Sequence, residues 1–130
     1  MNIRTVRDKA RLIARLAAES KGEDIVLIDI SKVSTMCDWF VLASASSARR
    51  IKTISDFVSR ELSKMQAYPV RVEGRANPFW SLVDMGDVVL HVFYKDIRDF
   101  YGLERLWSDS PREYFDGKCF TQTSRKNSNQ

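Results

Sequence analysis

Near the start of the chain, apolar residues recur every three or four positions, which is the spacing of one face of an α-helix. We therefore predict a helix over residues 3–21, with Gly22 as its C-terminal cap. A stripe on the opposite side of this helix consists of Arg4, Arg7, Arg11 and Arg15. Such a stripe is either a solvated helix face or a contact for RNA phosphates or an import receptor.

Short apolar runs bounded by polar clusters indicate buried strands in the next part of the chain. We expect strands at residues 24–30, 39–43 and 69–73. Between the second and third of these runs, Ser46-Ser47 precedes apolar residues at helical spacing that continue to Met65. A serine-capped helix packed on the sheet is predicted there.

A β-hairpin is predicted with Met85-Gly86 as its two-residue turn. The pairs that follow from this turn are Asp84 with Asp87, Leu82 with Val89, and Trp80 with His91. Alternation places one aliphatic set on the core face: Val83, Val88, Leu90 and Val92. The other face carries Trp80, Leu82, Asp84, Asp87, Val89, His91 and Phe93. Rings mixed with carboxylates are typical of a protein interface, and burial under a helix is the alternative.

After the hairpin, Asp96 can cap a short helix that Gly102 ends, followed by the segment 103–107. Ile97, Phe100 and Tyr101 share one side of that helix. Residues 119–130 are polar and aperiodic, which predicts a disordered C-terminal tail. The fold class expected is α/β (α+β), a single domain over residues 1–118 with a mixed sheet of about five strands flanked by helices.

Charge is unevenly distributed along these 130 residues, although their net charge is +4. Residues 1–79 hold 14 basic and nine acidic side chains, whereas residues 80–116 hold four basic and eight acidic ones. The aromatic-rich region is thus also the acidic one. That combination suits a basic protein partner better than a phosphate backbone. An ordinary solvated charge pattern explains the composition equally well.

Catalytic and metal-binding patterns are mostly missing. The single histidine, His91, excludes a histidine-rich metal site, and the nearby serines Ser44, Ser46 and Ser47 lack a G-x-S-x-G setting. Two distant cysteines form no C-x-x-C pair, which favours a reduced, cytosolic chain. Asp84 and Asp87 could hold magnesium, but no glycine-rich phosphate loop accompanies them. No apolar run approaches the ~20 residues of a membrane span. We expect no enzyme, cofactor or metal.

An ordered set of motifs then identifies a family. Its parts are residues 24–25, 27–30, 37–42, 54–56, 72–74, Trp80, residues 84–93, Arg98, Tyr101 and residues 103–107. The set, above all D-x-G-D-V-x-x-H-V followed by R-x-x-Y-x-L-E-x-L-W, closely resembles the ribosomal silencing factor family, also called the Iojap family. The likeness covers about residues 5 to 107. In place of the family's T-G-x-S and Arg-His pair, this chain has residues 44–47 and Arg49-Arg50.

This resemblance implies a domain akin to the nucleotidyltransferase fold but without its catalytic residues. It implies binding to large-subunit ribosomal protein fourteen, steric exclusion of the small subunit, and repression of translation under nutrient limitation. The contact residues carried over are Trp80, Asp84, His91, Arg98, Tyr101, Leu103 and Trp107. A cytoplasmic location is expected, or an organellar one in a eukaryote. Whether the free protein is a monomer or a homodimer stays open.

Two other functions compete with this reading of the sequence. One is a magnesium-dependent nucleotidyltransferase that uses Asp84 and Asp87. The other is an RNA-binding ribosome assembly module that uses the arginine stripe of the first helix.

Overall fold

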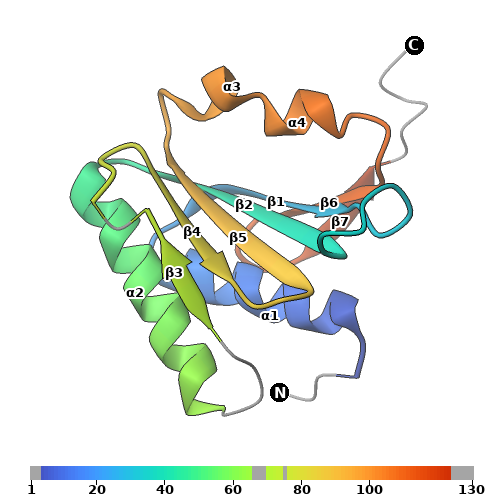
Figure 1. The fold of residues 1–130 in the computed structure, drawn as a ribbon, viewed down its shortest axis with the longest axis horizontal. Helices are drawn as coiled ribbons and strands as arrows, with labels where there is room; N and C mark the ends of the chain where they lie inside the picture. Colours follow the sequence, from blue (N-terminus) through green and yellow to red (C-terminus); the bar gives the residue numbers. More distant parts are fainter. Residues whose placement is uncertain (1–3, 66–69, 75, 124–130) are drawn as a thin grey trace.

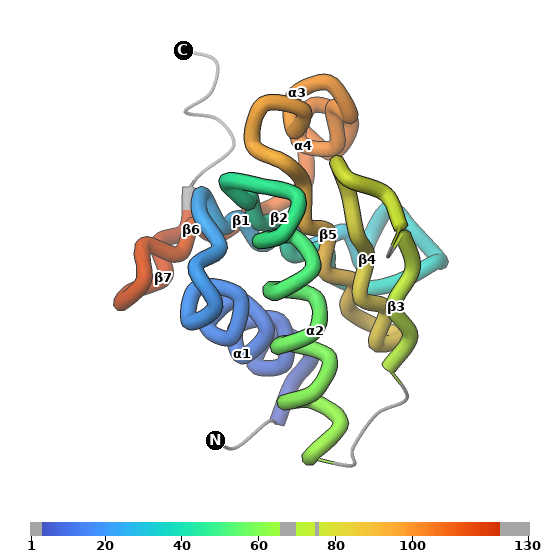
Figure 2. Tube along the Cα trace, turned by 90° about the vertical axis from the view of Figure 1, so that its left-hand side faces the viewer, coloured from blue at the N-terminus to red at the C-terminus, as the bar shows by residue number. Residues whose placement is uncertain are grey.

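The computed structural model describes residues 4–65, 70–74 and 76–123 as one α+β domain. The strands are β1 (Glu23–Asp29), β2 (Trp39–Ala45), β3 (Arg71–Glu73), β4 (Trp80–Asp84), β5 (Val88–Tyr94), β6 (Arg112–Phe115) and β7 (Phe120–Thr123). The helices are α1 (Val6–Glu19), α2 (Ala48–Lys64), α3 (Arg98–Tyr101) and α4 (Leu103–Leu106). Two helices lie on each face of the sheet, α1 and α2 on one and α3 and α4 on the other (Figures 1 and 2).

The sheet is mixed and has seven strands in the order β3-β4-β5-β2-β1-β6-β7 within the described residues. Its one parallel pair there is β2 with β5, and its other pairs are antiparallel. The prediction of a mixed sheet is confirmed, but the expected number of about five strands is too small. The missing strands are β6 and β7, which extend the edge beside β1.

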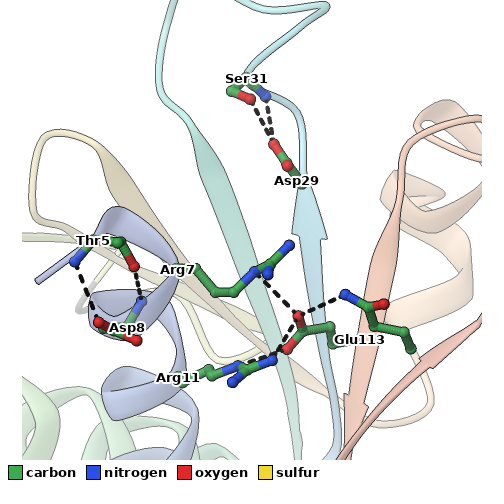
Figure 3. A network of polar contacts seen from close by, with 8 residues as sticks. Thr5, Arg7, Asp8, Arg11, Asp29, Ser31 and Glu113 are labelled. Atoms are coloured by element: carbon green, nitrogen blue, oxygen red, sulfur yellow. Dashed lines mark hydrogen bonds and ion pairs between the residues drawn. The ribbon is translucent and has the colours of Figure 1, made fainter. Parts of the chain in front are cut away.

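Helix α1 begins with a capping box, visible in Figure 3. The Thr5 hydroxyl accepts a hydrogen bond from the Asp8 N–H (3.1 Å), and the Asp8 carboxylate accepts one from the Thr5 N–H (3.3 Å). The helix ends at Glu19, two residues before the predicted end, and residue 3 lies outside the described part. Lys21, not Gly22, takes the left-handed conformation after the helix (φ 79°). The Gly22 N–H instead donates to the Ala17 carbonyl.

Helix α2 confirms the prediction of a serine-capped helix. The Ser47 hydroxyl accepts a hydrogen bond from the Arg50 N–H, and Ile51, Ile54, Val58 and Leu62 are buried against the sheet. The aliphatic hairpin set predicted for the core, Val83, Val88, Leu90 and Val92, is fully buried on the same face. The main core therefore lies between the sheet and helices α1 and α2.

The β4–β5 turn differs from the prediction by one residue. Gly86-Asp87 is the central pair, because Met85 N–H donates to the Val88 carbonyl (3.0 Å) and Gly86 has a φ of 88°. Pairing is accordingly Asp84 with Val89, Leu82 with His91, and Trp80 with Phe93. A glycine in the first central position relieves the strain of a positive φ. The shift of two positions in pairing leaves each side chain on its predicted face.

The connection from β5 to β6 crosses the second face of the sheet as α3 and α4. Asp96 does not cap α3, since Ile97 takes the N-cap position without a side-chain hydrogen bond. Gly102 does end α3, in the left-handed conformation (φ 69°). Within the described residues, no helix has the length and apolar character needed to cross a bilayer.

Strand β7 corrects the prediction of a disordered tail from residue 119. Phe120–Thr123 pairs with β6 in an antiparallel ladder, and the Phe115 and Phe120 rings stack with centroids 4.4 Å apart. Residues 124–130 of the predicted tail lie outside the described residues. The Thr and Gln residues of this edge strand are polar, so the sequence contains no apolar run that would predict a strand there.

Candidate functional site

The second face of the sheet carries its own hydrophobic cluster beneath α3 and α4. Its buried members are Val26, Ile28, Ile30, Cys37, Phe40, Leu42, Val89 and Phe93. Leu103 and Trp107, from α4 and the residue after it, pack on this cluster together with Trp80 and Leu82. For the centre of this face, burial under a helix is therefore the correct alternative. The interface remains a prediction for the edge of this face and for the outer side of α3 and α4.

The seven predicted contact residues divide by exposure. His91 and Arg98 are buried, at 9% and 8% exposure. The half-buried ones are Trp80, Asp84, Leu103 and Trp107. Tyr101 is exposed at 43%. The structure thus brings these residues to one side of the sheet, but only Trp80, Asp84 and Tyr101 combine exposure with a position outside the α4 packing.

Arg98 anchors α3 to the sheet. Its Nη1 donates to the Ser44 hydroxyl (2.8 Å) and to the Asp24 carbonyl, and its Nε donates to the Glu104 carboxylate (3.0 Å). This network joins α3 to β1, β2 and α4. Ser44 lies in the segment where the chain departs from the family's usual motif, and here it serves as an acceptor for Arg98.

His91 is held as a neutral imidazole. Burial lowers the pKa of His91 to about 4. The Trp80 indole N–H donates to Nδ1 over 3.5 Å, the long limit of a hydrogen bond, and the Phe40 ring lies edge-on with centroids 4.7 Å apart. Because Nδ1 accepts, Nε2 carries the proton. Among the residues that the structure describes, Nε2 has no hydrogen-bond partner.

The serines near His91 in the sequence analysis occupy positions that stabilise the fold or lie in a turn. Ser44 accepts the Arg98 hydrogen bond, and Ser47 caps α2. Ser46 is exposed in the turn between β2 and α2. The helix-capping interpretation is confirmed for Ser47 alone, since Ser44 lies within β2 and Ser46 precedes the cap.

The two carboxylates considered for magnesium are each held by a cation. Asp84 accepts hydrogen bonds from Arg71 (3.1 Å) and from the Gly86 N–H (2.8 Å). Asp87 accepts from Lys9, whose buried ammonium also donates to the Met85 carbonyl (3.0 Å). No group of three or more His, Cys, Asp or Glu side chains suited to a metal occurs in the described part of the chain. These carboxylates fix the hairpin turn to α1.

The arginine stripe of α1 packs on the strands at the sheet edge. Arg7 and Arg11 both contact the Glu113 carboxylate of β6, at 3.4 and 2.9 Å (Figure 3). Arg15 lies over the Phe115 and Phe120 rings. The hydrogen bond to Glu113 raises the pKa of Arg11. Three of the four arginines of the stripe thus have intramolecular partners. The predicted solvated or RNA-binding stripe is therefore not a free basic face.

Several exposed apolar side chains were not identified from the sequence. Phe100 is 82% exposed and Leu106 is 69% exposed, both on the outer side of the α3–α4 segment. Met36, in the loop between β1 and β2, is 83% exposed. Helical periodicity grouped Phe100 with Ile97 and Tyr101, but a helix of four residues is too short for periodicity to separate its faces. Exposed aromatic residues of this kind are typical of docking surfaces.

This α+β domain has exposed aromatic side chains on its α3–α4 side, and Asp84 and Asp87 are each engaged in an ion pair. Such features are typical of a binding protein. A family model described as "Ribosomal silencing factor during starvation" matches residues 3–130. The chain belongs to this ribosomal silencing factor family, whose members regulate translation and are not enzymes.

Relatives and solved structures agree with the family. The chain is 33% identical to ribosomal silencing factor RsfS of Bacillus subtilis, over 78% of this chain and 86% of the relative. It is 30% identical to the chloroplastic protein Iojap of Zea mays, over 75% of this chain and 42% of that protein. A crystal structure of a Chromobacterium violaceum protein superposes with a TM-score of 0.74 at 31% identity, covering 80% and 87% of the two chains.

Proposed function

We propose that the protein binds the large ribosomal subunit through its protein number fourteen and sterically blocks association with the small subunit. Translation then falls under nutrient limitation. Membership in the ribosomal silencing factor family supports the silencing role. The partner and the steric mechanism rest on the resemblance of the sequence motifs and on the character of the α3–α4 side of the molecule.

The single observation that carries the proposal is the exposure of aromatic side chains on this side. We define the docking surface as Trp80, Asp84, Phe100, Tyr101 and Leu106. It lies within the acidic region of the chain, which favours a basic partner. Buried His91 and Arg98, and half-buried Leu103 and Trp107, support this surface from below in the proposal.

Ribosomal subunits provide the direct test. Purified protein is mixed with separated small and large subunits and sedimented through a sucrose gradient at magnesium concentrations that permit joining. We expect it to travel with the large subunit and to reduce the joined-ribosome peak. Migration with the small subunit, or an unchanged joined peak at saturating protein, would refute the proposal.

Paired substitutions test the docking surface itself. Trp80→Ala with Tyr101→Ala should weaken binding to isolated large subunits by about 2 kcal/mol or more, as expected for aromatic anchors at the centre of an interface. Tyr114→Ala is the matched control, because Tyr114 is similarly exposed (40%) but belongs to β6. Unchanged affinity of the double variant would show that the surface is wrongly assigned.

The remaining parts of the proposal concern the cellular location, the likeness to the nucleotidyltransferase fold and a peripheral RNA contact. The bacterial relatives suit a cytoplasmic location, and the chloroplastic relative suits an organellar one if the source is eukaryotic. The likeness to the nucleotidyltransferase fold without its activity is also retained as a proposal. The predicted RNA contact of the arginine stripe is retained only as a peripheral one near Arg4, just before α1, since Arg7, Arg11 and Arg15 have partners within the molecule.

A further inference from the structure

A groove of about 710 Å³ opens on the second face of the sheet, beside the part that α3 and α4 cover. Phe40, Leu82 and Val89 line it, from β2, β4 and β5. Met36 and Val70 also line it, from the loop after β1 and from the residue before β3. The sequence motifs did not include Met36, which lies in a loop, or Val70, which falls in the predicted strand 69–73 but precedes β3 in the structure.

His91 adds an unused hydrogen-bond donor to this groove. His91 is one of the residues that line the groove, its side chain is 9% exposed, and its Nε2, buried just behind the groove surface, lacks a partner among the described residues. A buried N–H without an acceptor costs about 1–3 kcal/mol relative to a paired one. An oxygen acceptor brought by an occupant, with a small movement of the ring, would recover that free energy.

Charge at the mouth of the groove selects the occupant. Two carboxylates, Glu73 and Asp84, line the groove with one guanidinium, Arg71. Arg71 ion-pairs with both of them, at 3.5 and 3.1 Å, which leaves a net negative charge. A basic polypeptide therefore complements the mouth, whereas nucleic acid phosphates would be repelled.

We propose that this groove receives a basic polypeptide segment of the partner, which seats one large apolar side chain on the floor formed by Phe40, Leu82 and Val89. An oxygen of the same segment accepts from His91. The inference deepens the proposed function and rests on it, because the segment belongs to a protein of the large ribosomal subunit. The groove joins the docking surface at Asp84, so the two form one interface.

Met36 offers the sharpest test, since its side chain is 83% exposed and its replacement leaves the core intact. Met36→Lys places a cation against the basic segment and removes an apolar wall. We expect it to weaken binding to isolated large subunits at least tenfold, while Met36→Leu binds like the original protein. Met65→Lys, at an exposed methionine after α2, is the matched control and should bind normally. Val70→Lys tests the opposite wall; because Val70 also packs against the main core, urea unfolding first checks that this variant is folded.

The outcomes separate this inference from the proposed function. If the original protein binds large subunits and the two groove variants, Met36→Lys and Val70→Lys, bind equally well, the groove assignment is wrong and the proposed function stands. If the original protein binds no large subunits, both fail together. A photo-crosslinking amino acid at position 36 should join a basic ribosomal protein; a crosslink to ribosomal RNA alone would overturn the proposed occupant.

Discussion

At the scale of single residues, His91 links the pH of the solution to stability. Burial lowers the pKa of His91 to about 4 from 6.5, so between those values the unfolded chain binds more protons than the folded one. The stability contributed by the neutral ring is complete above pH 6.5 and is lost as the pH falls toward 4. From pH 7 to pH 5 we expect a loss of about 2 kcal/mol, measured by urea unfolding.

His91→Phe is the control for this pH dependence, because His91 is the chain's only histidine. Its unfolding free energy should change little from pH 7 to pH 5, where most carboxylates remain ionised. An equal loss in His91→Phe and in the original protein would show that another group is responsible.

Glu113 is the second residue whose environment makes a measurable prediction. Its carboxylate is fully buried and accepts hydrogen bonds from Arg11 (2.9 and 3.0 Å) and Gln122. Glu113→Gln removes the charge that pairs with two half-exposed arginines, so we expect about 1–3 kcal/mol lower stability in urea. Glu61→Gln, which disturbs the exposed pair with Lys64, should stay within about 0.5 kcal/mol. Equal effects would mean that burial of Glu113 contributes nothing.

At the scale of elements, the α3–α4 segment depends on Arg98. Both helices have four residues and lack side-chain caps. Arg98 holds α3 on the sheet, while α4 is held by the packing of Leu103 and Trp107 and by Arg112, which donates to the Trp107 carbonyl (2.8 Å). Arg98→Met should accelerate amide hydrogen exchange across residues 98–107 while α1 and β2 amides stay protected. Lys95→Met, at an exposed position just before the segment, should leave exchange unchanged. Uniform acceleration over the whole chain would indicate global destabilisation instead.

A helix or strand could be predicted where the residues that indicate it are close together in the sequence. The Ser47 cap and the apolar runs of β1 and β2 are contiguous in sequence, and the structure confirms them. Strand β6 was missed because its buried Glu113 is polar, and the Arg11 that pairs with it lies 102 positions earlier. The hairpin register was missed by one turn residue, yet its face assignment held because the error in pairing was an even number.

The sequence predicted where the candidate site lies in the fold better than it predicted which of its side chains are exposed to solvent. Motifs placed Trp80, His91 and Tyr101 on one side of the domain, but only the path of α3–α4 over the sheet decides which side chains reach solvent. Met36 carried no sequence signal at all. Its role in the groove depends on a loop brought next to β4 by the strand order β4-β5-β2.

At the scale of the whole molecule, steric exclusion requires that one face be enough to hold the protein in place. A stable interface buries about 600–1,000 Å² on each partner, roughly a tenth of the 7592 Å² of accessible surface of this chain. In the proposed mechanism, the docking surface and the groove, which share Asp84, supply that area on one side. The rest of the domain would then occupy the space that the other subunit needs.

Occupied volume also predicts the stoichiometry of inhibition. A steric block acts only while bound, so subunit joining, followed by light scattering, should decline in proportion to the fraction of large subunits occupied, with an end point near one protein per subunit. The concentration for half inhibition should match the Kd for isolated large subunits and rise equally in the Trp80→Ala, Tyr101→Ala double variant. Loss of joining at amounts of protein far below one per subunit would instead require turnover, and that result would contradict a purely steric mechanism.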